Sequence, residues 1–198
     1  MDEPSVNEAW VEQSLTGRLL VASPELGDPH FARTVVLLVD HDESGALGVV
    51  LNRPSTTDVS EILPDWHLYA TPPQVVFQGG PVGRDSALAL ASRLDGKGEE
   101  DEPLGFRHVY GGIGLVDLDT PAELVAGEVT SMRVFAGYAG WGSGQLETEI
   151  DEGSWFVVPA DPIDLADDDP ERLWERVLRR QPPRLAMVAT FPDDPSLN

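Results

Sequence analysis

The stretch Phe135-Ala136-Gly137-Tyr138-Ala139-Gly140-Trp141-Gly142-Ser143-Gly144-Gln145-Leu146-Glu147 is the most informative part of this sequence. It places four glycines, three aromatic residues and a glutamine between an apolar run and an acidic amphipathic run. Glycine lets a backbone turn sharply or approach another group closely. The spacing of the glycines does not fit the patterns of phosphate-binding loops. We therefore expect close packing here, with Gly140 admitting the Trp141 indole and Gln145 satisfying nearby backbone groups.

The segments on either side of this stretch predict short strands that alternate irregularly with helices. Short helices are expected at 58–63, 121–126 and 145–151, and a clearer one at 170–181, where an apolar stripe recurs at helical spacing. Because the strands outnumber the helices, the pattern favours an α+β fold. Strands are expected at 15–22, 34–39, 46–52, 74–78, 107–110, 113–118, 131–138, 155–158 and 185–190, while 86–91 fits either a strand or a helical turn.

The length of 198 residues fits one domain or two entangled lobes. We expect a flexible acidic arm at 1–14 and one domain at 15–198. A mobile acidic loop is predicted near 93–105, because four consecutive acidic residues, 99–102, lie there among glycines and a proline.

The composition excludes several classes of site. The chain has no cysteine, so disulfides, thiolate zinc sites and cysteine nucleophiles are ruled out. The acidic start lacks the apolar segment of a secretory signal, and no apolar run approaches the roughly 18 residues of a membrane span. These features predict a cytoplasmic protein without membrane association.

The charge is strongly acidic, with 35 Asp and Glu against 13 Lys and Arg and a net charge of −22. Duplex DNA is usually held through neutralisation of its phosphates by basic residues, so tight duplex binding is not expected. The four histidines have no short shared spacing. We therefore predict neither a bound metal nor a cofactor.

Two short motifs could support chemistry. The segment Asp40-His41-Asp42-Glu43 could hold a divalent metal or serve as acid and base, but its residues also suit a hairpin turn, which we favour. Asp28 and His30 flank a proline, and a histidine beside a carboxylate can act as a general base. No pattern places a serine nucleophile beside them, and Gly142-Ser143-Gly144 is one residue too tight for a nucleophile elbow.

Three ordered motifs resemble the YqgE/AlgH family of bacterial proteins, over nearly the whole chain from about residue 15. The first runs from Thr16 to Pro24 and continues through Asp28–Phe31 to Arg53-Pro54. The second is Val76–Val82. The third is Phe135–Trp141, with Gly144–Glu147, Glu149 and Trp155. The resemblance implies an α+β fold of two intertwined parts around a bifurcated, coiled mixed β-sheet with flanking helices. It implies no established activity.

The functional hypothesis is a binding or regulatory module with a groove at strand ends, for a small molecule or a protein. Loops on a rigid scaffold are where binding sites collect. One alternative is a hydrolase that uses Asp28, His30 and Glu149. The other is a transcriptional regulator, which the charge disfavours. The candidate binding residues are Asp28, His30, Asn52, Gly79, Gly80, Tyr138, Trp141, Gln145 and Glu149, and no catalytic residue is assigned.

Overall fold

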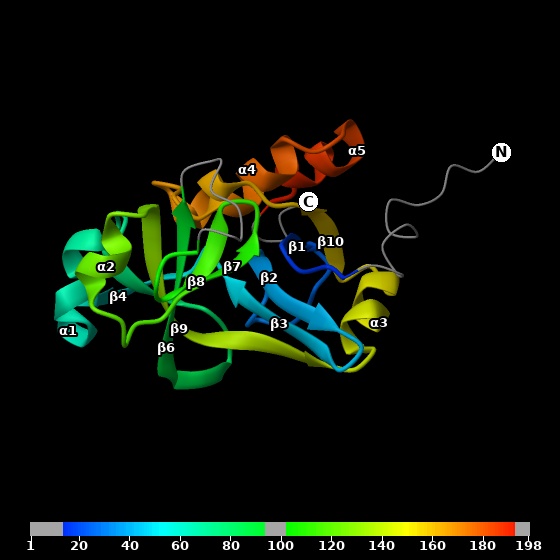
Figure 1. Ribbon diagram of the computed structural model, residues 1–198. Coiled ribbons are helices and arrows are strands. Elements are labelled where there is room, and N and C mark those ends of the chain that lie inside the picture. The colour runs from blue at the N-terminus through cyan, green and yellow to red at the C-terminus, as the bar shows by residue number, and fades with distance from the viewer. Residues whose placement is uncertain (1–13, 94–101, 193–198) are drawn as a thin grey trace.

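The computed structural model describes residues 14–93 and 102–192, and Figure 1 shows its ribbon. Within these ranges the strands form one ten-stranded sheet. The strands are β1 (Arg18–Ala22), β2 (Val35–Asp42), β3 (Gly45–Val50), β4 (Pro54–Asp58), β5 (Val75–Gln78), β6 (Val82–Arg93), β7 (Phe106–Tyr110), β8 (Ile113–Val116), β9 (Val129–Gly142) and β10 (Trp155–Pro159).

Short helices connect and cover the strands. The α-helices are α1 (Val59–Ile62), α2 (Ala122–Ala126), α3 (Gln145–Asp151), α4 (Leu173–Arg179) and α5 (Pro183–Ala186). The 3-10 helices are η1 (Pro64–Tyr69), η3 (Pro162–Asp164), η4 (Pro170–Arg172) and η5 (Met187–Thr190). In Figure 1, α4 and α5 lie along one side of the sheet, α1 and α2 at one end, and α3 at the other. No helix of the described ranges is both long and apolar enough to cross a bilayer.

The long strand β9 is the centre of the sheet, whose order is β10-β1-β2-β3-β9-β6-β8-β7. One edge of β9 pairs with β6. The other edge is shared: β5 pairs with it in parallel at Phe77 and Phe135, and β3 pairs antiparallel further along, at Gly48 and Ala139. The sheet therefore branches along β9, which confirms the bifurcated mixed sheet and the α+β class implied by the family resemblance.

Gly137 lies at the branch point. Its φ of +72° falls in the left-handed region, and a Cβ there would lie 2.7 Å from the carbonyl oxygens of both Gly80 and Val82. Glycine is thus required where β9 leaves the β5 branch and joins β3.

Three apolar cores fill the fold. The first lies between the sheet and α4, whose Trp174 Nε1 donates to the Ala22 carbonyl at 2.9 Å. The second contains Trp141 and Trp155 with α3 residues Leu146 and Ile150. The third contains residues of α1, η1 and α2 packed on β6, β8 and β9. Alternate residues of β1, β2 and β3 enter the first and second cores, as expected of strands buried on both faces.

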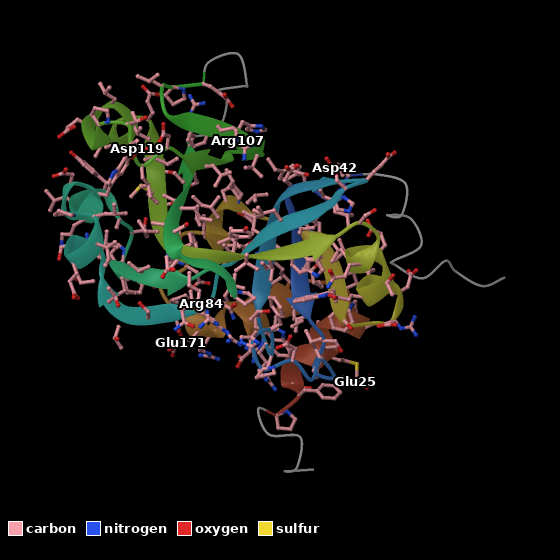
Figure 2. The ribbon with its side chains drawn as sticks, turned by 90° about the horizontal axis from the view of Figure 1, so that it is seen from below. Glu25, Asp42, Arg84, Arg107, Asp119 and Glu171 are labelled. Carbon is pink, nitrogen blue, oxygen red and sulfur yellow. The ribbon has the colours of Figure 1, made fainter. Side chains whose placement is uncertain are left out.

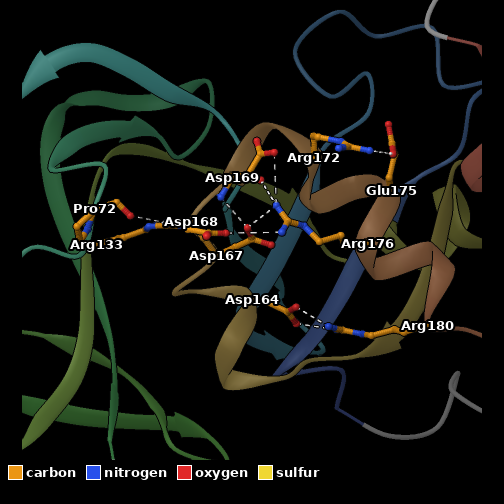
Figure 3. Close-up of polar contacts among 10 residues, drawn as sticks. All are labelled: Pro72, Arg133, Asp164, Asp167, Asp168, Asp169, Arg172, Glu175, Arg176 and Arg180. Atoms are coloured by element: carbon orange, nitrogen blue, oxygen red, sulfur yellow. Dashed lines mark hydrogen bonds and ion pairs between the residues drawn. The ribbon is translucent and has the colours of Figure 1, made fainter.

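Charged side chains join β9 to the C-terminal segment (Figure 3). Arg133 of β9 is only 1% exposed, and its Nη2 donates to the carbonyls of Pro72 and Asp167. Burial lowers the pKa of Arg133 to about 10, while the charges of Asp167 and Asp168 oppose that shift. Nearby, the buried Asp164 accepts from Arg180 at 2.5 and 2.7 Å. Arg133 therefore fastens β9 to the C-terminal segment, and the Asp164–Arg180 pair ties η3 to the end of α4 within that segment.

The predicted elements agree with the structure over most of the sheet. The helix predicted at 58–63 begins as expected, because the Asp58 side chain accepts from Ser60 N at 2.8 Å in a capping box with Glu61. Helix 170–181 is found as η4 followed by α4, with its apolar stripe buried. The segment 86–91 is part of the strand β6.

Three elements differ from the prediction. The strand expected at 185–190 is wrong: α5 and η5 lie there, since a proline pair starts a helical turn and a short apolar run does not distinguish helix from strand. The strand β4 was not predicted because its sequence, Pro54–Asp58, is polar. The strand expected at 131–138 continues to Gly142, so Trp141 lies in a strand and not in a loop. The predicted arm and acidic loop fall largely on 1–13 and 94–101, outside the described residues.

Candidate functional site

The residues of the glycine-rich stretch form a closed hydrogen-bonded cluster around Glu149. Its Oε2 accepts from the indole nitrogens of Trp141 and Trp155, each at 2.9 Å. Its Oε1 accepts from Gln145 Nε2 at 3.0 Å, one turn earlier on α3. The side-chain oxygen Oε1 of Gln145 in turn accepts from Gly142 N at 3.1 Å. Both carboxylate oxygens are therefore engaged by neutral donors of the protein.

Trp141 is buried, with 6% of its surface exposed. Its ring packs edge-on against Trp155, with centroids 6.0 Å apart, and is stacked with Phe31 at 6.2 Å. The room for the indole comes from Gly48 on the neighbouring strand, where a Cβ would lie 3.3 Å from Trp141 Cζ3 and 2.6 Å from Val36 Cγ1. The expected role of Gly140 is wrong, because a Cβ there would meet only Tyr138 Cε2 at 3.7 Å.

Asn52 is a buried link between backbone segments. Its Oδ1 accepts from Val35 N and its Nδ2 donates to the Arg33 carbonyl, both at 2.9 Å. Arg33 has a φ of +54°, unusual for a residue other than glycine. The amide thus holds a turn in place, and its hydrogen bonds leave it little capacity for a ligand.

Gly79, Gly80 and Tyr138 lie where β5 passes β9. Gly79 N donates to the Ala136 carbonyl at 2.9 Å, and a Cβ on Gly79 would lie 2.3 Å from Gly137 O. A Cβ on Gly80 would lie 2.1 Å from the Tyr138 carbonyl carbon. Close backbone approach explains both glycines.

Asp28 and His30 form an exposed pair in the loop before β2. The Asp28 carboxylate accepts from His30 N at 2.8 Å and lies 3.0 Å from His30 Nδ1. Glu149, the third residue of the hydrolase alternative, is occupied by its two indoles and Gln145, so no free carboxylate is available there.

The predicted hairpin is present between β2 and β3, but Asp40, His41 and Asp42 belong to β2 and pair with Leu47, Ala46 and Gly45. Only Glu43 and Ser44 form the turn. His41 ties this hairpin to α3, because its Nε2 lies 2.8 Å from Glu147 Oε1 while its Nδ1 accepts from Leu15 N at 2.9 Å. Within 14–93 and 102–192, no three His, Asp or Glu side chains gather closely enough to hold a metal ion.

An open groove of about 380 Å³ lies elsewhere, on the face of the sheet that also packs against α1, η1 and α2. The helices cover one part of this face, and the part formed by β5, β9 and the first half of β6 is open. Register places Gln78, Ala136 and Ala87 in one row across β5, β9 and β6. Ala136 and Ala87 of this row form an apolar floor together with Val76 and Val134. The groove is lined by Ser55, Thr57, Ile62, Val76, Phe77, Gln78, Arg84, Asp85, Ser86, Ala87, Val134 and Ala136.

A smaller recess of about 30 Å³ adjoins the groove and shares Gln78 and Arg84 with it. The other residues lining the recess are His30, Val50, Arg53, Gly80 and Pro81. Arg84 lies on the face of the molecule seen in Figure 2, in the exposed first half of β6. There β6 bulges away from β9, since four residues separate its pairings at Val82 and Ala87.

Of the nine residues named from sequence, His30 and Gly80 line the recess, while Trp141, Gln145 and Glu149 form the closed cluster. Sequence reasoning missed Arg53 and Arg84. Arginine has no local pattern that marks a ligand contact. The sequence carried only an indirect signal for these two arginines: each lies in a polar segment that follows a buried strand, and the chain has few basic residues.

The AlgH-like family matches this chain over residues 19–186. A UPF0301 protein of Streptomyces coelicolor is 63% identical over 185 residues, covering 93% of this chain and 96% of that protein. The chain belongs to the AlgH-like family. Another UPF0301 protein of the family, from Thermobifida fusca, is 53% identical over 194 residues, which cover 93% of this chain and 96% of that protein.

Two solved structures share the fold. The crystal structure of a Corynebacterium diphtheriae protein matches with a TM-score of 0.85 and 34% identity, covering 91% of this chain and 93% of that chain. The solution structure of the AlgH protein from Pseudomonas aeruginosa matches with a TM-score of 0.66 and 30% identity, over 97% of this chain and 98% of that chain. The structural similarity thus spans nearly the whole of this chain.

Proposed function

We propose that this AlgH-like protein is a binding module that takes a small organic molecule into the groove on the β5–β9–β6 face. The observation that carries the proposal is the interruption of the third core: the same sheet face that α1, η1 and α2 cover at one end is uncovered at the other. Apolar sheet surface normally packs against another layer, so an uncovered, concave portion suits a ligand.

The size and lining of the groove support this assignment. Ligand pockets are usually clefts of about 300–1,000 Å³ with mainly apolar walls and a few placed polar groups. The groove has about 380 Å³, an apolar floor that includes Val134 and Ala136, and polar residues such as Ser55 and Thr57 on the rim. It rests on paired strands, so it is formed before a ligand arrives.

The enzyme alternative has weaker support. A general base must lie within hydrogen-bond reach of a proton that it can accept. Both carboxylate oxygens of Glu149 accept hydrogen bonds from protein donors. The Asp28–His30 pair forms no hydrogen bond with a serine hydroxyl of the described residues. The regulator alternative is disfavoured by the net charge of −22, because duplex binding normally depends on neutralisation of phosphates by basic residues.

A groove-filling substitution tests the proposal. We expect 1-octanol, a neutral probe with an apolar chain, to shift the backbone amide NMR signals of Val76, Val134 and Ala136. Ala136→Leu places a larger side chain on the floor and should abolish these shifts. Thr56→Leu is the matched control, because Thr56 is an exposed β4 residue that does not line the groove; it should leave them intact. Absence of shifts at saturating octanol, or equal shifts in Ala136→Leu, would contradict the proposal.

A further inference from the structure

We propose that the ligand is an amphiphilic anion whose apolar chain lies in the groove and whose carboxylate or phosphate head enters the recess between Arg53 and Arg84. This inference rests on the proposed function and adds the chemical class of the ligand. It follows from the continuity of the two hollows: Gln78 and Arg84 line both, so a single molecule can extend from the apolar floor into the recess.

The recess offers free cationic donors. The hydrogen bonds of Arg53 within the described chain come from Nη2, which donates to the carbonyls of Pro29 and Ala32 at 3.2 and 3.0 Å. Its Nε–H and Nη1–H groups remain for a ligand. Arg84 forms no hydrogen bond or ion pair with any described residue. Arginine binds carboxylate and phosphate through such pairs of parallel donors.

The charges around the recess favour an anion at this place. In a chain of net charge −22, two arginines and a histidine meet here, and no Asp or Glu is among the described residues that line the recess. Two carboxylates lie nearby. Asp28 is engaged by His30, and Asp85 lines the groove but not the recess. Partial burial lowers the pKa of Arg53, and the negative charge of Asp28 raises it in part. An anionic head would offset that loss of hydration.

The volumes of the two hollows indicate which part of the ligand each one takes. The recess, of about 30 Å³, is much smaller than the groove, so it has space for a small head group and not for the whole ligand. The larger groove, of about 380 Å³, takes the remainder.

The test compares octanoate and octyl phosphate with 1-octanol, which has the same chain without the charge. By NMR titration at neutral pH, we expect at least one anion to bind the wild type about tenfold tighter than octanol, equivalent to one charge-assisted contact. The stronger of the two anions identifies the head group. The advantage should shrink at high salt, because part of it is a screened charge interaction.

Arg84→Gln should reduce this advantage to less than about threefold while octanol binding stays unchanged, and Arg84→Lys should retain part of it. Arg107→Gln, an exposed arginine on β7 away from the recess, is the matched control and should change nothing. If octanol binds in the groove but neither anion is preferred, or if Arg84→Gln keeps the preference, this inference is overturned and the proposed function stands. If neither octanol nor the anions bind, the proposed function itself fails.

Discussion

The glycine-rich end of β9 and the middle of the same strand differ in how the polar side chains around them are used. At the C-terminal end, Trp141, Gln145 and Glu149 satisfy one another, and Trp141 is 6% exposed. In the middle, Ala136 lies on an open floor beside Arg84, which has no partner among the described residues. The first region is closed by its own hydrogen bonds, while the second has unused donors.

The difference shows that the residue type does not by itself identify a binding site. A buried polar group that has all its hydrogen-bond partners contributes to stability and has little capacity for a ligand. An accessible donor without a protein partner can bind a ligand without breaking a hydrogen bond of the fold. The comparison predicts that substitutions in the closed cluster reduce stability and that substitutions beside the groove reduce binding alone.

The largest expected effect is that of Trp141→Ala. Truncating a buried tryptophan commonly costs about 3–5 kcal/mol of unfolding free energy, so the urea midpoint should fall clearly. Leu124→Ala is the control, because Leu124 is 54% exposed and its loss should matter little. An unchanged midpoint in Trp141→Ala would show that the indole is not a structural element.

Glu149→Ala should have the next largest effect, since it leaves two indole N–H groups without their acceptor. Buried donors without partners cost about 1–3 kcal/mol each, so two of them would cost about 2–6 kcal/mol. Because both hydrogen bonds are only part-buried, we expect a loss in the lower half of that range. Glu152→Ala, an exposed carboxylate just after α3, serves as the control. Urea unfolding measures both. A loss equal to that of the control would contradict the closed cluster.

Two glycine substitutions sharpen the comparison further. Gly79→Ala places a Cβ 2.3 Å from Gly137 O, which forces the backbone to move and should cost about 1–3 kcal/mol. Gly140→Ala meets only an ordinary contact at 3.7 Å and should change stability by less than about 0.5 kcal/mol. Thermal unfolding of the two variants side by side tests this order, and the reverse order would refute the assignment of Gly79 as the position of close approach.

The smallest effect on stability is expected for Arg84→Ala. Arg84 is exposed and has no described partner, so its removal should change the unfolding free energy by less than about 0.5 kcal/mol. The same variant should lose the preference for an anionic probe. A marked loss of stability would place Arg84 with the closed cluster and remove the contrast between the two regions.

The sequence by itself determined the features that depend on local pattern. Apolar strand runs, the short helix that begins at Asp58 and the α4 stripe follow from neighbouring residues, so these elements lie where the sequence predicts them. The family motifs supplied the bifurcated sheet. The grouping of Trp141, Gln145 and Glu149 also follows from short spacing, because a strand, a tight turn and the first turns of a helix keep these residues together.

Tertiary structure alone decided the role of each group. Gly48 makes room for Trp141 from another strand, and Trp155 completes the bonding of Glu149 from β10. His30, Arg53 and Arg84 come from three separate segments and meet because β5 and β3 share one edge of β9. The physical reason is that burial and hydrogen-bond saturation depend on which distant groups the fold brings within contact, and no local pattern of residues encodes that distance.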